Sequence, residues 1–425
     1  MTVKAGSIMT VAGHTVIQRL QSQGLTNVRV PINTVREIGN DLVVDKVPQE
    51  PDFTFSMESL AVDNSIEALL HGRISSGPDP DQGAGQTDPD GTEYKWEESQ
   101  CLNILSPWKD PQSFGSGNVA AGHIIPGYYP SKLSYKFGVT EDAMITAELR
   151  GGAFYYGNGM APTEDVFQGV NGTPDYASNE PAVYYRIGGV LGTTFKSALG
   201  VIVNGVMMVE GEDYTVTGGG PVDTPTDLVV SFTNYQVQTD DDIRIAYFTT
   251  NAHSYPQTVH ESALILPGAV RGRNNCLSIA SGGSATWERV YGVQTFTLDA
   301  SFDITPEREL CNEEIVGFTV NGTDCTGAIT VHAKDINAFF RLLRRFTGVD
   351  TDEEVVGWLN LNPVRLKLEI TDPTNPGRVI KTLYVPDARF DIPGTPARVN
   401  AVVDFTMNYE SLVGTYSAFK GAADV

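Results

Sequence analysis

Residues 27–70 read NVRVPINTVREIGNDLVVDKVPQEPDFTFSMESLAVDNSIEALL, and a second version of this stretch lies at residues 302–318 and 328–343. In both versions an alternating apolar run leads into a charged turn, and a helical pattern closes the stretch. The versions align at residues 36–40 (REIGN) with 308–312 (RELCN), 53–55 with 329–331, and 66–70 with 339–343. Internal repeats set an architecture before any single residue does, so the repeat decides the fold.

The matches continue in the same order along both halves. Residues 101–105 followed by a turn at Ser106-Pro107 match residues 364–370 followed by Asp372-Pro373. Two later strands match as well: 123–126 with 383–386, and 143–151 with 401–409. The order predicts a tandem duplication. The alternative is a pair of unrelated β-rich domains that share common turn signals.

Composition agrees with a β-rich protein of two or three domains. The 425 residues include 43 glycines and 24 prolines, which predict many turns, and 41% hydrophobic residues, which are enough for globular cores. We therefore expect a mainly β fold: a β-sandwich or barrel-like unit with one flanking helix, duplicated, plus a small all-β module.

The net charge of −23 disfavours binding to nucleic acid or to an anionic membrane, because both normally require clustered lysine and arginine. Two interpretations remain: a charge that keeps the protein soluble, or a surface that must not adhere to a polyanion.

Local patterns place several elements. Residues 7–23 suggest an amphipathic helix, and residues 28–47 suggest a hairpin around Gly39-Asn40-Asp41. Residues 52–58 alternate as a strand that buries Phe53, Phe55 and Met57, and a helix follows at residues 65–71. The stretch 75–92 has no large apolar residue and predicts a solvated loop without a calcium-binding frame.

A separate β pattern lies between the copies, with a two-residue hairpin signal at Asn204-Gly205. The Gly-rich stretch 218–221 and the acidic triplet 240–242 predict turns. We therefore expect a first domain at 1–180, an inserted β module at 181–250, a linker at 251–285 and a second domain at 286–425.

The sequence contains no enzyme motif. The six histidines are scattered, and no metalloprotease, nucleophile-elbow or phosphate-loop pattern occurs, so we expect neither catalysis nor a cofactor. The four cysteines form no zinc-binding spacing and are expected as free thiols, with a Cys311–Cys325 pair as the alternative. No membrane-length apolar run or secretion signal is evident, which favours folding in a cytoplasm.

Arg341, Arg344 and Arg345 cluster on the second-copy helix. A solvated helix face explains them most simply. Contact with the carboxylates of a neighbouring subunit is one alternative, and nucleic-acid binding, which the strongly acidic composition disfavours, is the other.

The order of strand, R-E-[IL]-[GC]-N turn, two strands, helix and C-terminal strand set resembles the tail tube protein of long-tailed bacteriophages. The resemblance covers about residues 28–151 and 293–409, and the middle module is similar to small β domains of phage tail proteins and fibres. The resemblance to tail tube proteins implies two packed antiparallel sheets with a flanking helix. It also implies that copies join their sheets edge to edge into rings and that the rings stack into a hollow tube.

Rings of this family typically hold six units, so a chain with two units implies a homotrimer that forms a pseudo-hexameric ring. The implied partners are other copies of the chain, a tape measure protein, a tail terminator and baseplate or distal tail proteins. Genome DNA would pass through without specific binding, and no membrane is involved. The implied location is the tail of a virion, assembled in the host cytoplasm.

An acidic lumen would repel DNA phosphates. Candidate lumen-facing residues are Glu37, Asp41, Asp45, Glu309, Glu313 and Asp404. Candidate inter-subunit contacts are Asp79, Asp81, Asp88, Asp90, Arg341, Arg344 and Arg345. The middle module is expected on the tube exterior. The alternatives are a terminator, baseplate or hub protein of the same fold, and a host-binding β protein.

Overall fold

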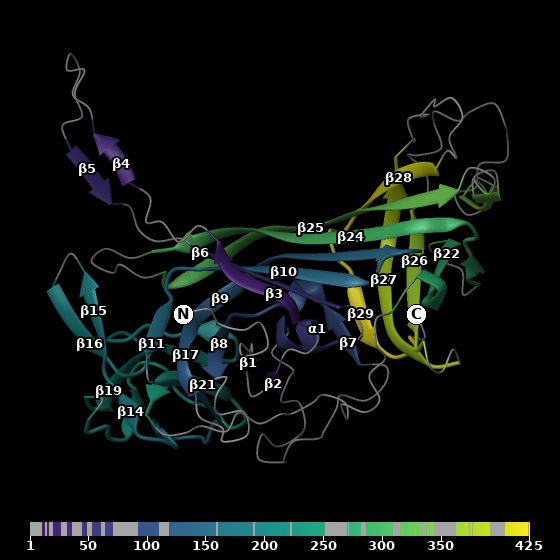
Figure 1. Ribbon diagram of the computed structural model, residues 1–425. Coiled ribbons are helices and arrows are strands. Elements are labelled where there is room, and N and C mark those ends of the chain that lie inside the picture. The colour runs from purple at the N-terminus through teal and green to yellow at the C-terminus, as the bar shows by residue number, and fades with distance from the viewer. Residues whose placement is uncertain are drawn as a thin grey trace.

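The chain folds mainly into β-strands, which confirms the predicted fold class. The computed structural model describes residues 11–12, 15–16, 20–26, 32–35, 45–48, 53–60, 64–70, 92–109, 119–158, 160–189, 192–221, 223–250, 270, 272–281, 286–308, 315–332, 335, 338–339, 341–343, 363–373, 375, 377–391, 404–423 and 425. Three parts follow one another along the chain (Figure 1), and we call them the first unit, the middle module and the second unit.

The first unit comprises β1 (Val11–Ala12), β2 (Thr15–Val16), β3 (Leu20–Thr26), β4 (Ile32–Val35), β5 (Asp45–Pro48), β6 (Phe53–Leu60), α1 (Ser65–Leu70), β7 (Glu93–Lys95), the short 3-10 helix η2 (Trp96–Glu98), β8 (Leu102–Lys109), β9 (Val119–Gly138), β10 (Met144–Gly151) and β11 (Tyr155–Asn158). The second unit comprises η3 (Gly272–Asn274), β22 (Asn275–Ser281), β23 (Glu288–Arg289), β24 (Val293–Glu307), β25 (Gly317–His332), helical residues 338–339 and 341–343, β26 (Val364–Thr371), β27 (Val379–Phe390), β28 (Asp404–Ser411) and β29 (Ser417–Lys420).

Both units use the same strand pairing. In the first unit β3 pairs with β6, β6 with β10, β10 with β9, and β9 with β8 and β11. In the second unit β24 pairs with β25, β25 with β28, β28 with β27, and β27 with β26 and β29. The hairpins β1–β2 and β22–β23 pair in turn with β8 and β26. The two units are therefore structural repeats of one another.

The pairing also fixes which residues are equivalent. Met57 lies opposite Ala147, and Ile329 lies opposite Met407 at the corresponding place in the second unit. Arg150 lies opposite Tyr129 and Glu410 lies opposite Arg389, so Ala147 is equivalent to Met407 and Met57 is equivalent to Ile329. The sequence alignment of residues 53–55 with 329–331 was therefore wrong by four residues, and that of residues 143–151 with 401–409 was wrong by two. A strand repeats its facing every two residues, so an even shift leaves the apolar pattern unchanged and the sequence could not reveal either error.

Two local predictions were also wrong. The helix predicted at residues 7–23 is replaced by β1, β2 and the start of β3, because pairing with β6 and β8 favours extended chain there. Strand β8 does not turn at Ser106-Pro107 but continues to Lys109. A proline is tolerated in β8 because its pairing with β1 is confined to Leu105 among the described residues.

One hydrophobic core runs through both units. It includes Phe55 and Met57 from β6, Leu133 from β9, Leu298 from β24 and Met407 from β28, all buried. Helix α1 adds Ile66 and Leu70. The helix, the strand β6 with its inward Phe53, Phe55 and Met57, and the alternation of β28 were predicted correctly.

The middle module comprises β12 (Ala161–Gln168), β13 (Asp175–Ala177), β14 (Ala182–Val183), β15 (Tyr185–Gly189), β16 (Gly192–Lys196), β17 (Gly200–Val203), β18 (Val206–Met207), β19 (Tyr214–Gly218), β20 (Leu228–Phe232) and β21 (Asp242–Thr249). β12 pairs along its whole length with β21, so the module begins near residue 160 and not at 181. Asn204 and Gly205 have φ values of 51° and 75°, and this two-residue turn confirms the predicted hairpin.

The module packs on the back of the first unit. Ile104 and Ile125 point into the main core, whereas their neighbours Leu105 and Ile124 point to the opposite face and contact a separate cluster with Phe248 of the module. Successive strand residues face opposite sides of a sheet. The β8–β9 sheet therefore separates the main core from the module, which lies beneath it in Figure 1.

Candidate functional site

The two units are joined through their sheet edges. Residues 132–138 of β9 pair antiparallel with residues 295–301 of β24, and Ser134 lies opposite Asp299. This junction gives a continuous strand order of β3, β6, β10, β9, β24, β25, β28 and β27. The edge supplied by the first unit differs from the edge supplied by the second, so the contact is head-to-tail.

One face of the joined sheet is polar, and we call it the polar face. It consists of the strand residues that alternate with the buried core residues, such as Glu58 beside Met57 and Asp299 beside Leu298. One row of cross-strand partners runs through Glu58, Thr146, Ser134, Asp299, Thr326 and Glu410. The polar face therefore extends from the first unit to the second without interruption.

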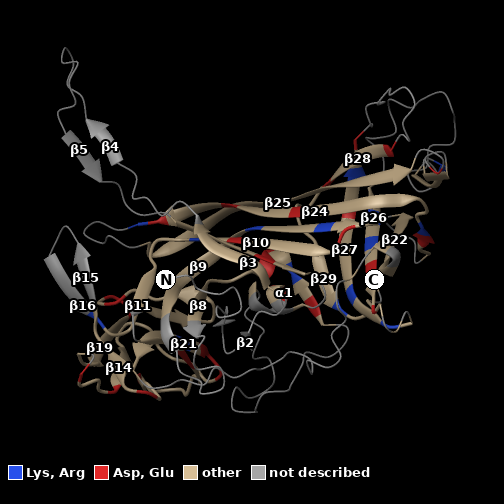
Figure 2. Cartoon of the chain, viewed as in Figure 1, with Lys and Arg blue, Asp and Glu red and all other residues tan. Residues whose placement is uncertain are grey.

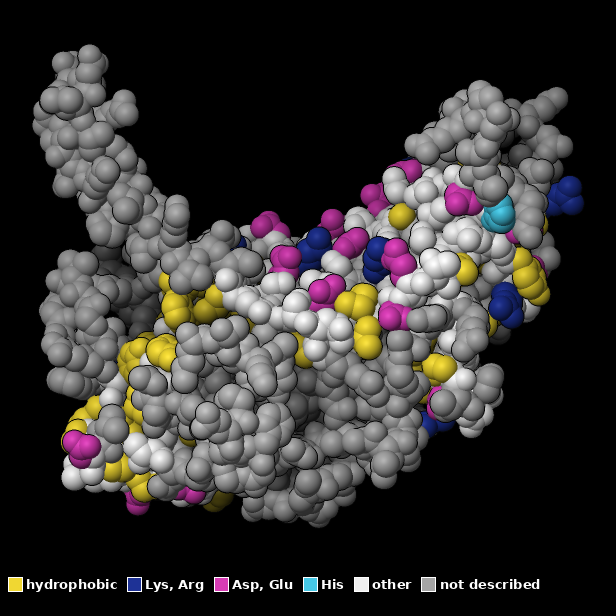
Figure 3. Space-filling model, viewed as in Figure 1, with side chains coloured by type: hydrophobic (Ala, Val, Ile, Leu, Met, Phe, Trp, Pro, Cys, Tyr) yellow, Lys and Arg dark blue, Asp and Glu magenta, His cyan; other side chains and the backbone are white. Residues whose placement is uncertain are grey.

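Carboxylates outnumber cations on the described part of this face. The carboxylates belong to Glu58, Glu148, Asp299, Asp303, Asp324, Asp404 and Glu410. The cations belong to Lys132, Lys136, Arg150 and Arg389. Figure 2 shows charged segments on the strands of this sheet, and Figure 3 shows acidic and basic side chains along its upper side in that view.

Carboxylates lie next to several of these cations. Lys132 Nζ lies 3.8 Å from Asp299 Oδ1, and Lys136 Nζ lies 2.6 Å from Glu141 Oε2. These pairs are exposed, so each contributes at most about 1 kcal/mol to stability. Their main effect is on the potential: lysines neutralised locally do not attract phosphate, and the excess carboxylates repel it.

A buried network fastens the first unit to the second beneath this face. Lys381 Nζ of β27 and the Tyr135 hydroxyl of β9 both donate to Glu67 Oε1 of α1, each at 2.5 Å. The Tyr135 hydroxyl also lies 3.2 Å from that of Tyr416. Burial, together with the nearby Glu67 carboxylate, raises the pKa of Tyr135 and Tyr416 well above the ordinary value.

Aromatic side chains cover the same boundary. Phe302 of β24 stacks on Trp96 with ring centroids 4.3 Å apart, and Tyr129 meets Phe302 at 5.5 Å and Phe318 at 5.9 Å. Aromatic pairs of this kind add specific contact energy to area burial. The junction is thus packed as a protein interior.

The structure brings few of the predicted site residues together. Asp404 lies on the polar face, with Oδ1 3.4 Å from His332 Nδ1. Asp45 lies in β5, and Arg341 is exposed on the second-unit helix. The remaining predicted residues lie outside the described residues: Glu37, Asp41, Asp79, Asp81, Asp88, Asp90, Glu309, Glu313, Arg344 and Arg345.

Most carboxylates of the polar face were not predicted as site residues. Glu58 and Glu148 stand at polar positions of alternating strands, next to Met57 and Leu149. That alternation was visible in the sequence and is the signal that would have found them. The acidic residues of β24 and β25 depend on the strand facing shown by the structure.

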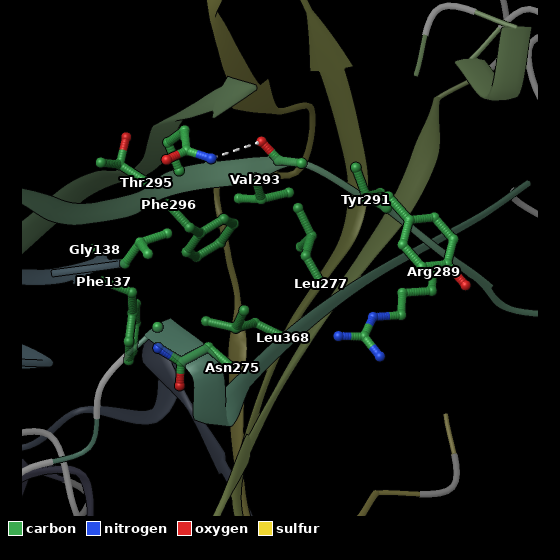
Figure 4. Close-up of a pocket in the computed structure, with 15 residues that line it drawn as sticks. Phe137, Gly138, Asn275, Leu277, Arg289, Tyr291, Val293, Thr295, Phe296 and Leu368 are labelled. Carbon is green, nitrogen blue, oxygen red and sulfur yellow. Dashed lines mark hydrogen bonds between the residues drawn. The ribbon is translucent and has the colours of Figure 1, made fainter. Parts of the chain in front are cut away.

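A small pocket lies at one end of the junction, with a volume of about 150 Å³. Phe137 and Gly138 of β9, Asn275 of β22 and Phe296 of β24 line it (Figure 4). The buried Asn275 amide has no hydrogen-bond partner on either Nδ2 or Oδ1 among the described residues. The described lining includes no carboxylate, histidine or cysteine, so the pocket offers no acid–base pair.

The described part of the chain offers no metal centre and no disulfide. No cluster of three or more His, Cys, Asp or Glu side chains is placed to hold a metal ion. Cys325 is a free buried thiol, and Cys311, its predicted alternative partner, lies outside the described residues. Among these residues no helix is long and apolar enough to cross a membrane.

No family model matches the sequence, and no curated protein matches it.

Proposed function

We propose that the chain is a structural subunit of a phage-type tail tube, in which copies join edge to edge into rings and rings stack around a DNA channel. The observation that carries the proposal is the head-to-tail junction between β9 and β24. A head-to-tail contact between repeated units can be applied again and again, and it closes into a ring or continues as a filament.

The edges needed for further growth can be named. β24 is equivalent to β3, and β3 pairs only with β6 among the described strands. β9 is equivalent to β27, whose described part ends at Phe390. A second copy would therefore place its β3 edge against the β27 side of the first copy, as β24 lies against β9. Pairing of these edges would also protect them from aggregation.

The polar face supports a channel lining. Its carboxylates repel phosphate, which favours passage of DNA over binding. The main core, the β8–β9 sheet and the middle module follow in that order behind it. With the polar face turned to the channel, the module lies on the exterior.

We propose three chains per ring, which give six units. In the virion tail, the partners would be a tape measure protein, a terminator and baseplate or distal tail proteins.

Electron microscopy of the purified chain tests the proposal. We expect hollow tubes or stacked rings that contain six units each. Isolated closed rings that do not stack would indicate a terminator, and persistent monomers at high concentration would reject self-assembly.

A further inference from the structure

The pocket at the end of the junction is built by strands of both units (Figure 4). Phe137 of β9 lies opposite Phe296 of β24 across the junction, with ring centroids 6.2 Å apart. Leu277 of β22 and Leu368 of β26 lie opposite one another in the second unit and complete the apolar wall. A molecule in the pocket would therefore contact both units at once.

Asn275 is a polar residue at a core position. Along β22 the side chains of Leu277 and Ile279 belong to the main core, and Asn275 precedes them with the same facing. Its backbone lies opposite Ile370 in the pairing of β22 with β26, so the sheet fixes the place of its side chain. An amide thus stands where an apolar residue would continue the pattern of the strand.

The Asn275 amide is buried without a partner. Neither Nδ2 nor Oδ1 forms a hydrogen bond with a described residue, although both atoms are shielded from solvent. Most buried polar side-chain atoms in proteins are hydrogen-bonded, because an unpaired atom keeps the full cost of its desolvation. The two unpaired atoms are one donor and one acceptor, side by side on the same planar group. A ligand with the complementary pair would satisfy both.

The size of the pocket limits such a ligand to one ring. The pocket volume is about 150 Å³, and an apolar cavity of about this volume accepts one benzene molecule. The side chains of Phe137, Phe296, Leu277 and Leu368 offer an apolar lining that suits the faces and edges of an aromatic ring.

The other end of the pocket carries a cation. The Arg289 guanidinium lies 5.6 Å from the centre of the Tyr291 ring, and Tyr291 is 68% exposed. The described lining contains no carboxylate. A cationic ligand would therefore meet repulsion without compensation, whereas a neutral or anionic ligand would not.

We propose that this pocket is a binding site for a small molecule with a single aromatic ring and an amide group, neutral or anionic. The carbonyl of the ligand accepts from Asn275 Nδ2, its N–H donates to Asn275 Oδ1, and its ring packs against Phe137 and Phe296. The inference goes beyond the proposed function. It concerns a site within a single chain, so it holds or fails whether or not the chain forms tubes.

Two probes of nearly equal size test the recognition without any substitution. Benzamide carries both amide atoms, whereas acetophenone keeps the ring and the carbonyl but has a methyl group in place of the NH2 group. Saturation-transfer NMR of the full chain should give a dissociation constant of about 1 mM or lower for benzamide. Acetophenone should bind about tenfold more weakly, because Asn275 Oδ1 stays unpaired. Equal affinities, or no saturable binding of benzamide, would overturn the proposal.

The variant Asn275→Leu tests the residue itself. It should lower the affinity for benzamide about tenfold or more, because both hydrogen bonds are lost. It should also raise the melting temperature of the chain without ligand, because an apolar side chain replaces a buried amide that has no partner. The matched control is Asn321→Leu on β25, where the exposed side chain donates to Thr305 Oγ1 outside the pocket. This control should bind benzamide as the wild-type chain does.

Water is the alternative occupant of the pocket. Ordered water could satisfy the Asn275 amide, and Asn275→Leu would then lower the melting temperature. Unchanged benzamide affinity in this variant would overturn the proposal, and a lower melting temperature alongside it would assign Asn275 to the fold alone. Tubes formed by a chain that does not bind benzamide would overturn this inference and leave the proposed function standing, whereas binding by a chain that never assembles would do the reverse.

Discussion

Glu67 and Lys381 illustrate how single side chains hold the two units together. Both are almost fully buried, and one carboxylate oxygen, Oε1, accepts from both Lys381 and Tyr135. The other oxygen, Oε2, has no hydrogen-bond partner among the described residues. The attraction within a buried ion pair offsets little more than the free energy of desolvating its two charges. Removal of one partner is nevertheless strongly destabilising, because it leaves a buried charge without compensation.

Lys381→Met should therefore lower the free energy of unfolding by about 3–5 kcal/mol. Combining it with Glu67→Leu should recover most of the loss, because no buried charge then remains. Urea unfolding of both variants provides the measurement. A loss below about 1 kcal/mol for Lys381→Met would show that water reaches the Glu67 carboxylate.

Alkaline pH should destabilise the fold through buried phenols. Burial raises the pKa of Tyr129 to about 12, and the pKa values of Tyr135, Tyr409 and Tyr416 are raised further above the ordinary value. A phenol with a raised folded-state pKa contributes its full stabilisation below about pH 10, the unfolded value, and loses it as pH rises through the folded value. Unfolding free energies at pH 8–11, compared with phenolate absorbance, should show stability falling while these tyrosines stay neutral. A flat profile above pH 10 would contradict this expectation.

The residue types along a strand also depend on what packs against each face of its sheet. Leu105 and Ile124 are apolar because the middle module packs on them. Their equivalents in the second unit are Lys367 and Tyr384, and both contact the ring of Trp287. The continuous apolar pairs Ile104-Leu105 and Ile124-Ile125, against the alternation of residues 366–368, are the sequence signal of this difference.

At the scale of secondary-structure elements, the β24–β25 hairpin shows how a strand pair can serve a neighbour. The pairing of β24 with β9 ends at Ser301. Beyond it, Phe302 contacts Trp96 and Tyr129, and Ile315 packs against Gly152. The contact needs a residue without a side chain at position 152.

Gly152→Val should cost about 1–3 kcal/mol, because Ile315 and its backbone must move. Gly322→Ala is the control, since a methyl group there would meet no atom within 4 Å. Thermal unfolding should separate the two variants by several degrees. Equal melting temperatures would mean that the hairpin end adjusts without cost.

Sequence patterns predicted elements with strong local signals. The strand β6, the helix α1, the strand β26 and the Asn204-Gly205 turn all occur as expected. They did not predict β3, because its partner β6 lies at the far end of a long hairpin. They also placed the module boundary too late, because β12 finds its partner β21 only after the whole module has been traversed.

At the scale of the whole molecule, the order of layers separates two surfaces with different roles. The polar face looks away from the main core on one side, and the module covers the back of the β8–β9 sheet. Charge changes on these two surfaces should therefore have different effects on DNA.

Tubes of the variant Glu58→Lys/Asp299→Lys/Glu410→Lys should retain DNA, because the channel wall would attract phosphate. Retention should weaken steeply with salt. The control is Asp175→Lys/Glu212→Lys/Asp223→Lys, which makes the same charge change on exposed residues of the middle module. Filter binding at several salt concentrations provides the measurement. Equal retention by both variants would place the polar face outside the channel.

The covalent link between the two units has a consequence for errors in assembly. Every chain brings two equivalent units already joined at the β9–β24 junction. A closed ring made by repeating that junction must then hold an even number of units. For the proposed ring of six units, the nearest miscounts, five and seven units, are excluded by arithmetic and need no energetic penalty.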